Sequence, residues 1–105
     1  MDSIVDLLWK IRARPGLYLG YPSVNNLYMF LQGYTFARHE DAKEDNKFLS
    51  GFGDMVSKRF RITTSQGWAK TIEFFSSSPD DEMELFWKLL DTYIAQRKPA
   101  RKKVS

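Results

Sequence analysis

The side chains with the most obvious capacity for chemistry are two clusters of carboxylates. The first cluster follows the pair Ser78-Pro79 and consists of Asp80, Asp81, Glu82 and Glu84. The second follows the single histidine of the chain and consists of Glu40, Asp41, Glu44 and Asp45. Grouped carboxylates can bind a divalent cation or act as general acids and bases. Each cluster is therefore a candidate site whose surroundings decide its role.

The rest of the chain offers little support for catalysis at these acids. A helix dipole already favours acids in the first turn after Ser78-Pro79. The chain has one histidine, His39, and no cysteine, so transition metals have few ligands. It also lacks the HExxH, GxxxxGK[ST] and GxGxxG motifs of metalloproteases, P-loop proteins and dinucleotide-binding proteins. We therefore expect no enzymatic activity, no metal and no cofactor.

The distribution of charge points instead to the binding of a partner. The formal net charge is +3, but residues 97–105 alone carry five basic and no acidic side chains. The remaining body therefore has a balance of −2. Exposed acidic clusters on such a body can attract and orient a basic protein. Both clusters are thus candidate protein-binding surfaces.

Nucleic-acid binding is the alternative. Lys58, Arg59, Arg61 and the basic tail over residues 97–105 could contact phosphates, and the nearby Phe60 and Trp68 could stack on bases. This interpretation is less favoured, because acids outnumber bases in the body and both aromatic residues fit a hydrophobic core more simply.

Apolar spacing predicts four helices, over residues 3–13, 23–38, 48–60 and 79–96. The polar segment 39–47 reads as a loop with at most a turn of helix. Residues 61–75 fit either a hairpin closed by Ser65-Gln66-Gly67 or a helix starting at Gly67, in which Trp68, Ile72 and Phe75 share one face, and the helix is favoured. The predicted fold is all-α, a compact bundle of four to five helices. Gly33, inside the second helix, predicts close packing against a neighbouring helix.

A Pro/Gly-rich segment connects the first two predicted helices. Its sequence is RPGLYLG, and its structural residues are Arg14, Pro15, Gly16, Tyr18 and Gly20. Proline disfavours helix at the residue before it, and glycine accepts a positive φ. We expect a tight turn that ends the first helix at Arg14 and buries Leu17, Tyr18 and Leu19.

Length and composition predict one domain. At 105 residues the chain suits a single core over residues 1–96, followed by a basic, disordered tail over residues 97–105. The start of the chain does not resemble a signal peptide, and no apolar run approaches the roughly 20 residues of a membrane span. The absence of cysteine suits a reducing compartment. We expect a cytoplasmic protein.

Several segments resemble, in order, small bacterial immunity proteins found beside contact-dependent growth inhibition and polymorphic toxins. The matching segments cover residues 4–94 and include RPGLYLG, Ser23, FLQGY at 30–34, the aromatic stretch 48–60, Gly67-Trp68 and residues 86–93. A similar heptapeptide, RPGMYIG, occurs in the ATPase subunit of type II topoisomerases. This chain lacks the DxGxG element of that nucleotide site, so we interpret that match as a shared turn.

The resemblance to immunity proteins implies a function without catalysis. Such a protein binds its cognate toxin domain, often a nuclease, and blocks the active site or the substrate surface of the toxin. The two acidic clusters would complement a basic nuclease cleft. The alternative is a small nucleic-acid-binding or regulatory adaptor domain.

Overall fold

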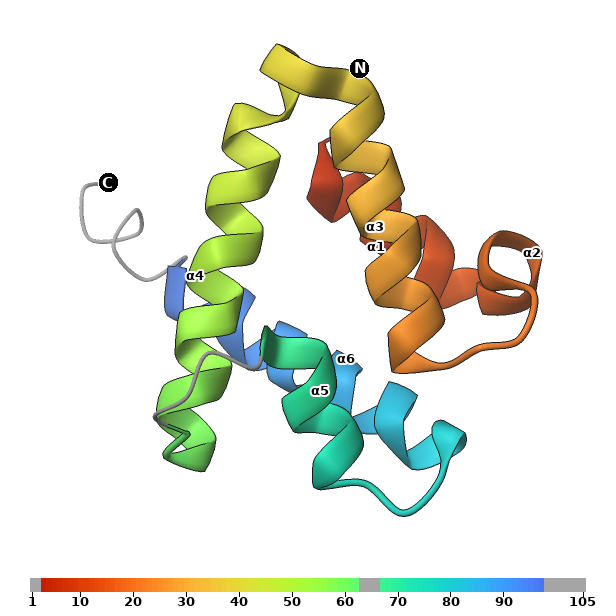
Figure 1. The fold of residues 1–105 in the computed structure, drawn as a ribbon, viewed down its shortest axis with the longest axis vertical. Coiled ribbons are helices and arrows are strands. Elements are labelled where there is room, and N and C mark those ends of the chain that lie inside the picture. Colours follow the sequence, from red (N-terminus) through yellow and green to blue (C-terminus); the bar gives the residue numbers. More distant parts are fainter. Residues whose placement is uncertain (1–2, 63–66, 98–105) are drawn as a thin grey trace.

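The computed structural model describes residues 3–62 and 67–97, and every element in these ranges is helical (Figure 1). In chain order the elements are α1 (Ile4–Ala13), α2 (Pro15–Leu19), α3 (Val24–Arg38), the 3-10 turn η1 (His39–Ala42), α4 (Lys43–Phe60), α5 (Gly67–Phe74) and α6 (Pro79–Arg97). Five of these helices have eight residues or more. The predicted all-α fold is confirmed.

Serine caps set the start of three helices. The Ser3 side chain accepts from the Asp6 N–H, and Asp6 returns the bond in a capping box. Ser23 accepts from the Asn26 N–H at 3.1 Å to begin α3. Ser78 accepts from the Asp81 N–H at 3.2 Å to begin α6. These short-range signals explain why the predicted starts of α3 and α6 agree with the structure.

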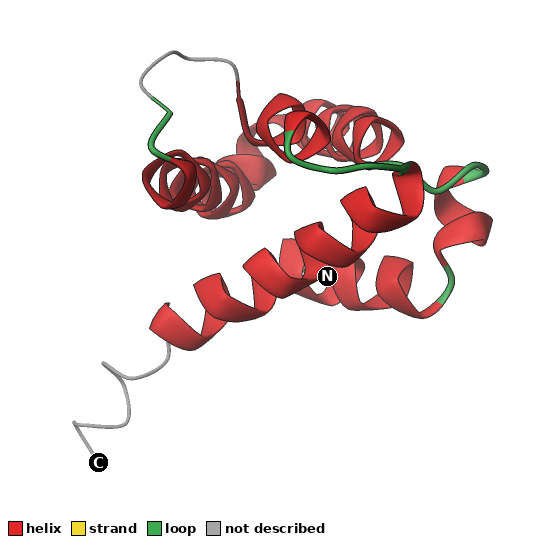
Figure 2. Ribbon diagram, turned by 90° about the horizontal axis from the view of Figure 1, so that it is seen from below, coloured by secondary structure: helices red, strands yellow, loops and turns green. Residues whose placement is uncertain are grey.

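The helices form two layers. α3 and α4 diverge from η1, and α5 packs against both of them at their far ends (Figure 1). In the view of Figure 2, α6 crosses beneath this layer. Its buried residues, which include Phe86 and Leu90, meet Leu27 and Leu31 of α3 in one core.

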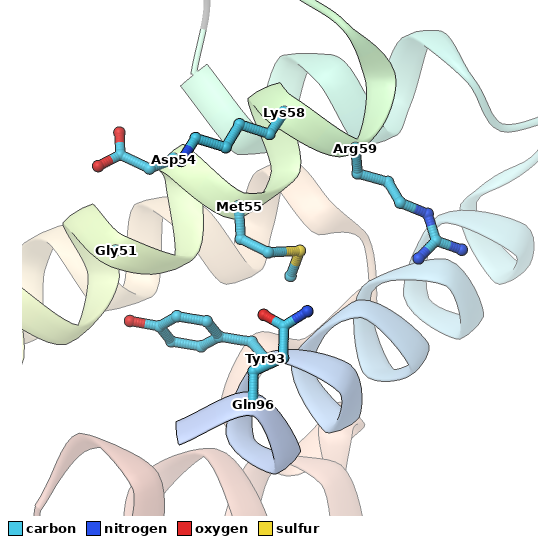
Figure 3. A pocket seen from close by; sticks show the side chains of 7 residues that line it. All are labelled: Gly51, Asp54, Met55, Lys58, Arg59, Tyr93 and Gln96. Carbon is cyan, nitrogen blue, oxygen red and sulfur yellow. The ribbon is translucent and has the colours of Figure 1, made fainter. Parts of the chain in front are cut away.

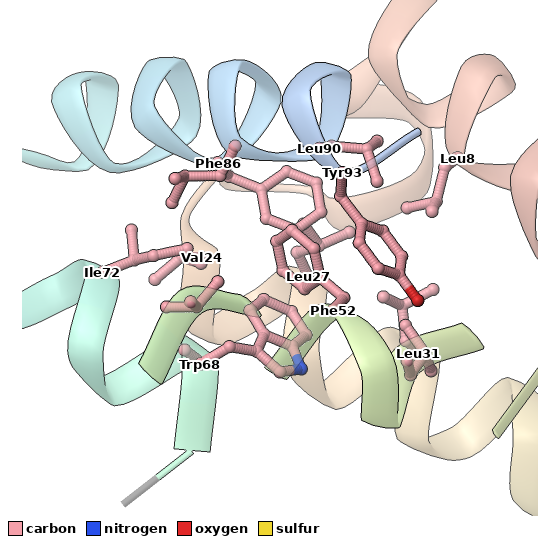
Figure 4. Packing of buried hydrophobic residues seen from close by; sticks show 14 of the residues in the cluster. Leu8, Val24, Leu27, Leu31, Phe52, Trp68, Ile72, Phe86, Leu90 and Tyr93 are labelled. Atoms are coloured by element: carbon pink, nitrogen blue, oxygen red, sulfur yellow. The ribbon is translucent and has the colours of Figure 1, made fainter. Parts of the chain in front are cut away.

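Phe52 of α4 lies at the centre of the core and is 1% exposed (Figure 4). Its ring makes edge-to-face contacts with Trp68, Phe86 and Tyr93, with centroid distances of 5.5, 5.3 and 5.7 Å. Such pairs add to the free energy of burial. The Tyr93 hydroxyl donates to the Phe48 carbonyl at 2.9 Å and occupies the space that a Cβ at Gly51 would need. Gly51 therefore permits the close approach of α4 and α6.

The segment predicted as a loop over 39–47 is helical instead. It forms η1 and the first turns of α4, which begins at Lys43. The reason is that its polar sequence hides a buried side: Ala42 is 0% and Asp45 is 5% exposed, three residues apart. These two residues continue the buried stripe of Phe48 and Leu49 backwards, so the helix extends toward the N-terminus.

For the ambiguous segment 61–75, the helical alternative is correct where the structure describes it. Gly67 to Phe74 form α5, with Trp68 and Ile72 buried. Residues 71–74, which the hairpin alternative assigned to a strand, belong to this helix. The proposed hairpin turn at Ser65-Gln66 lies outside the described residues.

The segment 14–20 contains a short helix rather than a simple turn. α1 ends at Ala13 as expected, and Pro15 opens α2 as its first residue. Leu17 is 69% exposed, so its predicted burial is wrong. Tyr18 and Leu19 are half-buried, and Tyr18 packs edge-on against Phe30. A five-residue helix cannot turn three consecutive side chains toward one core.

Two further predictions about individual residues are corrected. A Cβ at Gly33 would meet no atom within 4 Å, so no neighbouring helix packs against it. Arg97, assigned to the disordered tail, is the last residue of α6, and its guanidinium lies 5.2 Å from the Phe48 ring centroid. Residues 98–105 lie outside the described part of the chain.

Candidate protein-binding surface

Asp45, one of the eight candidate acids, belongs to the interior. Its Oδ2 accepts from the Arg38 guanidinium at 2.7 Å, and its Oδ1 accepts from the Ile4 N–H at 3.1 Å. It therefore neutralises a half-buried arginine and caps the N-terminus of α1. With 5% of its surface exposed, Asp45 cannot contact a partner, and its assignment to the binding surface is wrong.

Glu82 also turns inward. Its Oε1 accepts from the Val24 N–H at 3.1 Å, across 58 residues of chain. The N-terminus of α3 thus has two caps, Ser23 and Glu82, which satisfy N–H groups that the helix itself cannot. Glu82 is half-buried and already bonded, so it holds α6 against α3 and is a structural residue.

Three acids of the first cluster remain exposed: Asp80, Asp81 and Glu84. Within residues 3–62 and 67–97, none of these carboxylates forms an ion pair. Asp81 and Glu84 line a shallow groove of about 240 Å³ between the end of α5 and the start of α6. The other residues that line it are Phe75, Ser76, Ser77, Leu85 and Lys88.

The groove is flanked by two aromatic residues that the sequence analysis did not assign to a binding site. Phe74 is 74% and Phe75 is 45% exposed. Phe75 stacks on Phe60 with ring centroids 4.6 Å apart, and Phe74 meets Phe75 edge-on at 5.0 Å. The helical pattern predicts Phe75 on the same face as Trp68 and Ile72, but α5 ends at Phe74 and Phe75 is exposed. The sequence did contain a signal for this exposure. Phe74 and Phe75 are consecutive at a helix end, and two consecutive side chains of a helix cannot both face one core.

A second aromatic cluster lies further along α6. Glu84, Trp87 and Asp91 share one side of the helix at spacings of three and four residues. Asp91 binds the Arg12 guanidinium of α1 with two contacts, of 2.9 and 3.1 Å. That guanidinium lies 5.2 Å from the Trp87 and 5.5 Å from the Trp9 ring centroid. The hydrogen bond from Arg12 lowers the pKa of Asp91, although desolvation opposes the shift.

We group the groove and this cluster, which Glu84 of α6 links, as the α6 surface. It consists of Phe74, Phe75, Asp80, Asp81, Glu84, Trp87 and Trp9. Aromatic side chains anchor protein interfaces when they are already ordered, and exposed acids at their border steer basic partners. The α6 surface combines both features.

The second acidic cluster lies elsewhere. Glu40, Asp41 and Glu44 are exposed on η1 and the first turn of α4. Figure 1 places η1 at one end of the long axis and the start of α6 toward the other. The structure therefore does not combine the two predicted acidic clusters into one surface.

Two of the three basic residues named in the body for the nucleic-acid alternative border a groove between α4 and α6, whereas Arg61 follows the end of α4. Lys58 and Arg59 border a groove of about 540 Å³, with Met55 pointing from α4 toward Tyr93 and Gln96 (Figure 3). Trp68, proposed to stack on bases, is only 6% exposed. Base stacking by Trp68 is therefore excluded, and its assignment to the core is confirmed.

Two other kinds of site, a metal centre and a membrane-spanning helix, are absent from the described ranges. No group of three or more His, Cys, Asp or Glu side chains there is arranged to hold a metal ion. None of the helices in those ranges combines the length and apolar character needed to cross a bilayer.

Comparisons with protein-family models, with curated proteins and with solved structures found no match to this chain.

Proposed function

We propose that this chain is an immunity protein that binds a cognate bacterial toxin domain, a nuclease, and blocks its active site or substrate surface. The observation that carries the proposal is the α6 surface, where Phe75, in contact with the exposed Phe74, lines one groove with the exposed acids Asp81 and Glu84. The residue order RPGLYLG, FLQGY and Gly67-Trp68, which resembles immunity proteins, supports the same function.

The chemistry of the α6 surface suits this role. A nuclease binds a polyanion and presents a cationic cleft, which the carboxylates of Asp80, Asp81 and Glu84 complement. The aromatic rings provide apolar contact area near the centre of such an interface, where binding energy concentrates. A standard interface covers roughly 800 Å² on each partner. That is about a ninth of the 7072 Å² total surface of the protein.

Direct nucleic-acid binding has less support. The groove with Lys58 and Arg59 also contains the carboxylate of Asp54, and its floor is formed by Met55 and Tyr93. Phosphate binding through so few cations is weak and falls steeply with salt. A salt-dependent change in DNA or RNA mobility that survives deletion of residues 97–105 would support this alternative over the immunity function.

The first test is binding and protection. We expect the protein to co-purify with the toxin domain encoded beside its gene and to protect cells that express that toxin. Absence of both binding and protection would overturn the proposal.

The second test locates the interface. The double variant Asp81→Lys/Glu84→Lys should slow association with the toxin by about tenfold at low salt, because charge reversal at an interface border acts mainly on the association rate. Glu40→Lys/Glu44→Lys makes the same change of charge on η1 and α4 and serves as the control. Stopped-flow fluorescence at two salt concentrations measures both. Equal slowing by the two variants would remove the α6 surface from the interface.

A further inference from the structure

The outward side of α3 is exposed and carries no charged residue of its own, and Lys70 and Glu73 of α5 border it near Asn25 and Met29. Its exposed positions are Asn25, Met29, Gln32, Gly33, Phe36 and Ala37. Met29 is 60% and Phe36 is 75% exposed. Arg38, at the last position, is the one charged residue among Val24–Arg38. We call these six residues the α3 face.

The spacing within the α3 face is symmetric. Met29 and Phe36 stand seven residues apart, so the midpoint between them falls between Gln32 and Gly33. Residues at this spacing lie along one side of a helix. A Cβ at Gly33 would have no neighbouring atom within 4 Å. The centre of the face is therefore a depression, and the larger side chains of Met29 and Phe36 project on either side of it.

We propose that the α3 face binds a second copy of this chain, with the two α3 helices antiparallel about a two-fold axis near Gln32 and Gly33. A two-fold axis there places Met29 of each copy against Phe36 of the other, a favourable sulfur–aromatic contact. Gln32 of each copy lies over Gly33 of the other, where the missing side chain leaves room. The same residues thus form both halves of the interface.

The distribution of charge favours a second copy of the chain as the partner of the α3 face. Two α6 surfaces would bring Asp80, Asp81 and Glu84 against their own copies, and like charges facing each other oppose association. The α3 face carries no charge at its exposed positions, so it can meet itself without repulsion.

The area predicts a weak dimer. Met29 and Phe36 together with the smaller side chains offer roughly 400–500 Å² per copy, about half of the 800 Å² in a standard interface. We therefore expect dissociation at micromolar to millimolar concentrations. The opposite side of α3, with Leu27 and Leu31 in the core, is the side that meets α6. Dimers would leave the α6 surface open, so the dimer is independent of the proposed toxin binding.

Sedimentation equilibrium across protein concentrations tests the dimer. The expected result for the unmodified protein is a concentration-dependent shift from monomer to dimer. Gly33→Lys should abolish the shift, because it places two cations at the two-fold axis. It should also raise the Tm by about 4–8 °C, since lysine is favoured over glycine in an exposed helix. Gly16→Lys, at another open helical glycine, is the control that keeps the dimer. A monomer at every concentration, or a dimer in Gly33→Lys, would overturn the proposal.

Cysteine cross-linking tests the antiparallel geometry. The chain has no native cysteine, so a single introduced thiol reports on one position. Gln32→Cys should form a disulfide-linked dimer under mild oxidation, because its Cα atoms lie near the axis. Asn25→Cys, equally on the α3 face but two turns from the axis, should not. Cross-linking at both positions would indicate parallel helices and contradict the antiparallel arrangement, and cross-linking at neither would exclude contact near the axis.

Discussion

Each end of α1 is held by an aspartate from a different helix, and the two attachments differ in how deeply they are buried. At the N-terminus, Asp45 of α4 caps the Ile4 N–H and pairs with Arg38. The side chains of that pair are 18% (Arg38) and 7% (Asp45) exposed. At the C-terminal end, Asp91 of α6 binds Arg12, with side chains 38% (Arg12) and 51% (Asp91) exposed.

Burial decides what each pair contributes. An exposed ion pair remains solvated and screened, and adds between 0 and 1 kcal/mol. In a buried pair, removal of one partner leaves the other charged and poorly solvated. The two ends of α1 therefore provide similar geometry with different energetic consequences, and substitutions at each end can separate them.

Asp45→Ala should cause the largest loss. It removes the carboxylate partner of Arg38 and leaves the Ile4 N–H without its cap, so we expect the free energy of unfolding to fall by about 3 kcal/mol. Asp45→Asn retains an acceptor for the N–H and should lose less. Urea denaturation followed by circular dichroism measures both. A loss below 1 kcal/mol in Asp45→Ala would show that this end of α1 is no more important than the other.

Glu82→Ala separates capping from ion pairing, because Glu82 caps α3 without an arginine partner. We expect a loss of about 1 kcal/mol in the free energy of unfolding, the usual contribution of a helix cap. Glu84→Ala, two residues away and exposed, should change stability by less than about 0.5 kcal/mol. Thermal denaturation of the two variants in parallel makes the comparison, and equal losses would remove the distinction between inward and outward acids.

Asp91→Asn should have the smallest effect and should depend on pH. The folded-state pKa of Asp91 is lowered by the hydrogen bond from Arg12. Its contribution is therefore complete above the unfolded pKa of about 3.9 and is lost as the pH falls through the lower folded pKa. We expect Asp91→Asn to cost a few tenths of a kcal/mol at pH 7 and nothing near pH 2. A difference that stays constant over this range would exclude the charge as its cause.

The sequence predicts local features of this fold better than its long-range contacts. Ser23 and Ser78 mark helix starts correctly because each caps an N–H three residues away. The inward orientation of Asp45 and Glu82 was not predictable, because their backbone partners lie 41 and 58 residues away. For the same reason, the packed helices are needed to tell which acids of the candidate site are exposed and which are structural.

Gly33 and Phe75 show a related limit of the sequence pattern. Periodicity indicates which residues share a side of a helix, and it does not indicate whether a neighbour covers that side. Gly33 was expected beneath another helix and lies open, whereas Phe75 was expected in the core and is 45% exposed. The two candidate interfaces, on α6 and α3, are both found where these expectations failed.

The attachment of α1 also has a consequence for the order of folding. Its polar anchors join residues 41 and 79 positions apart, whereas α3, η1 and α4 are consecutive in the chain. Contacts between distant residues require costly loop closure before they form. We therefore expect the contact between Arg12 of α1 and Asp91 of α6 to form after α3, η1 and α4 have packed together. Substitution of Asp91 should then accelerate unfolding and leave the refolding rate nearly unchanged, which stopped-flow kinetics in urea would reveal.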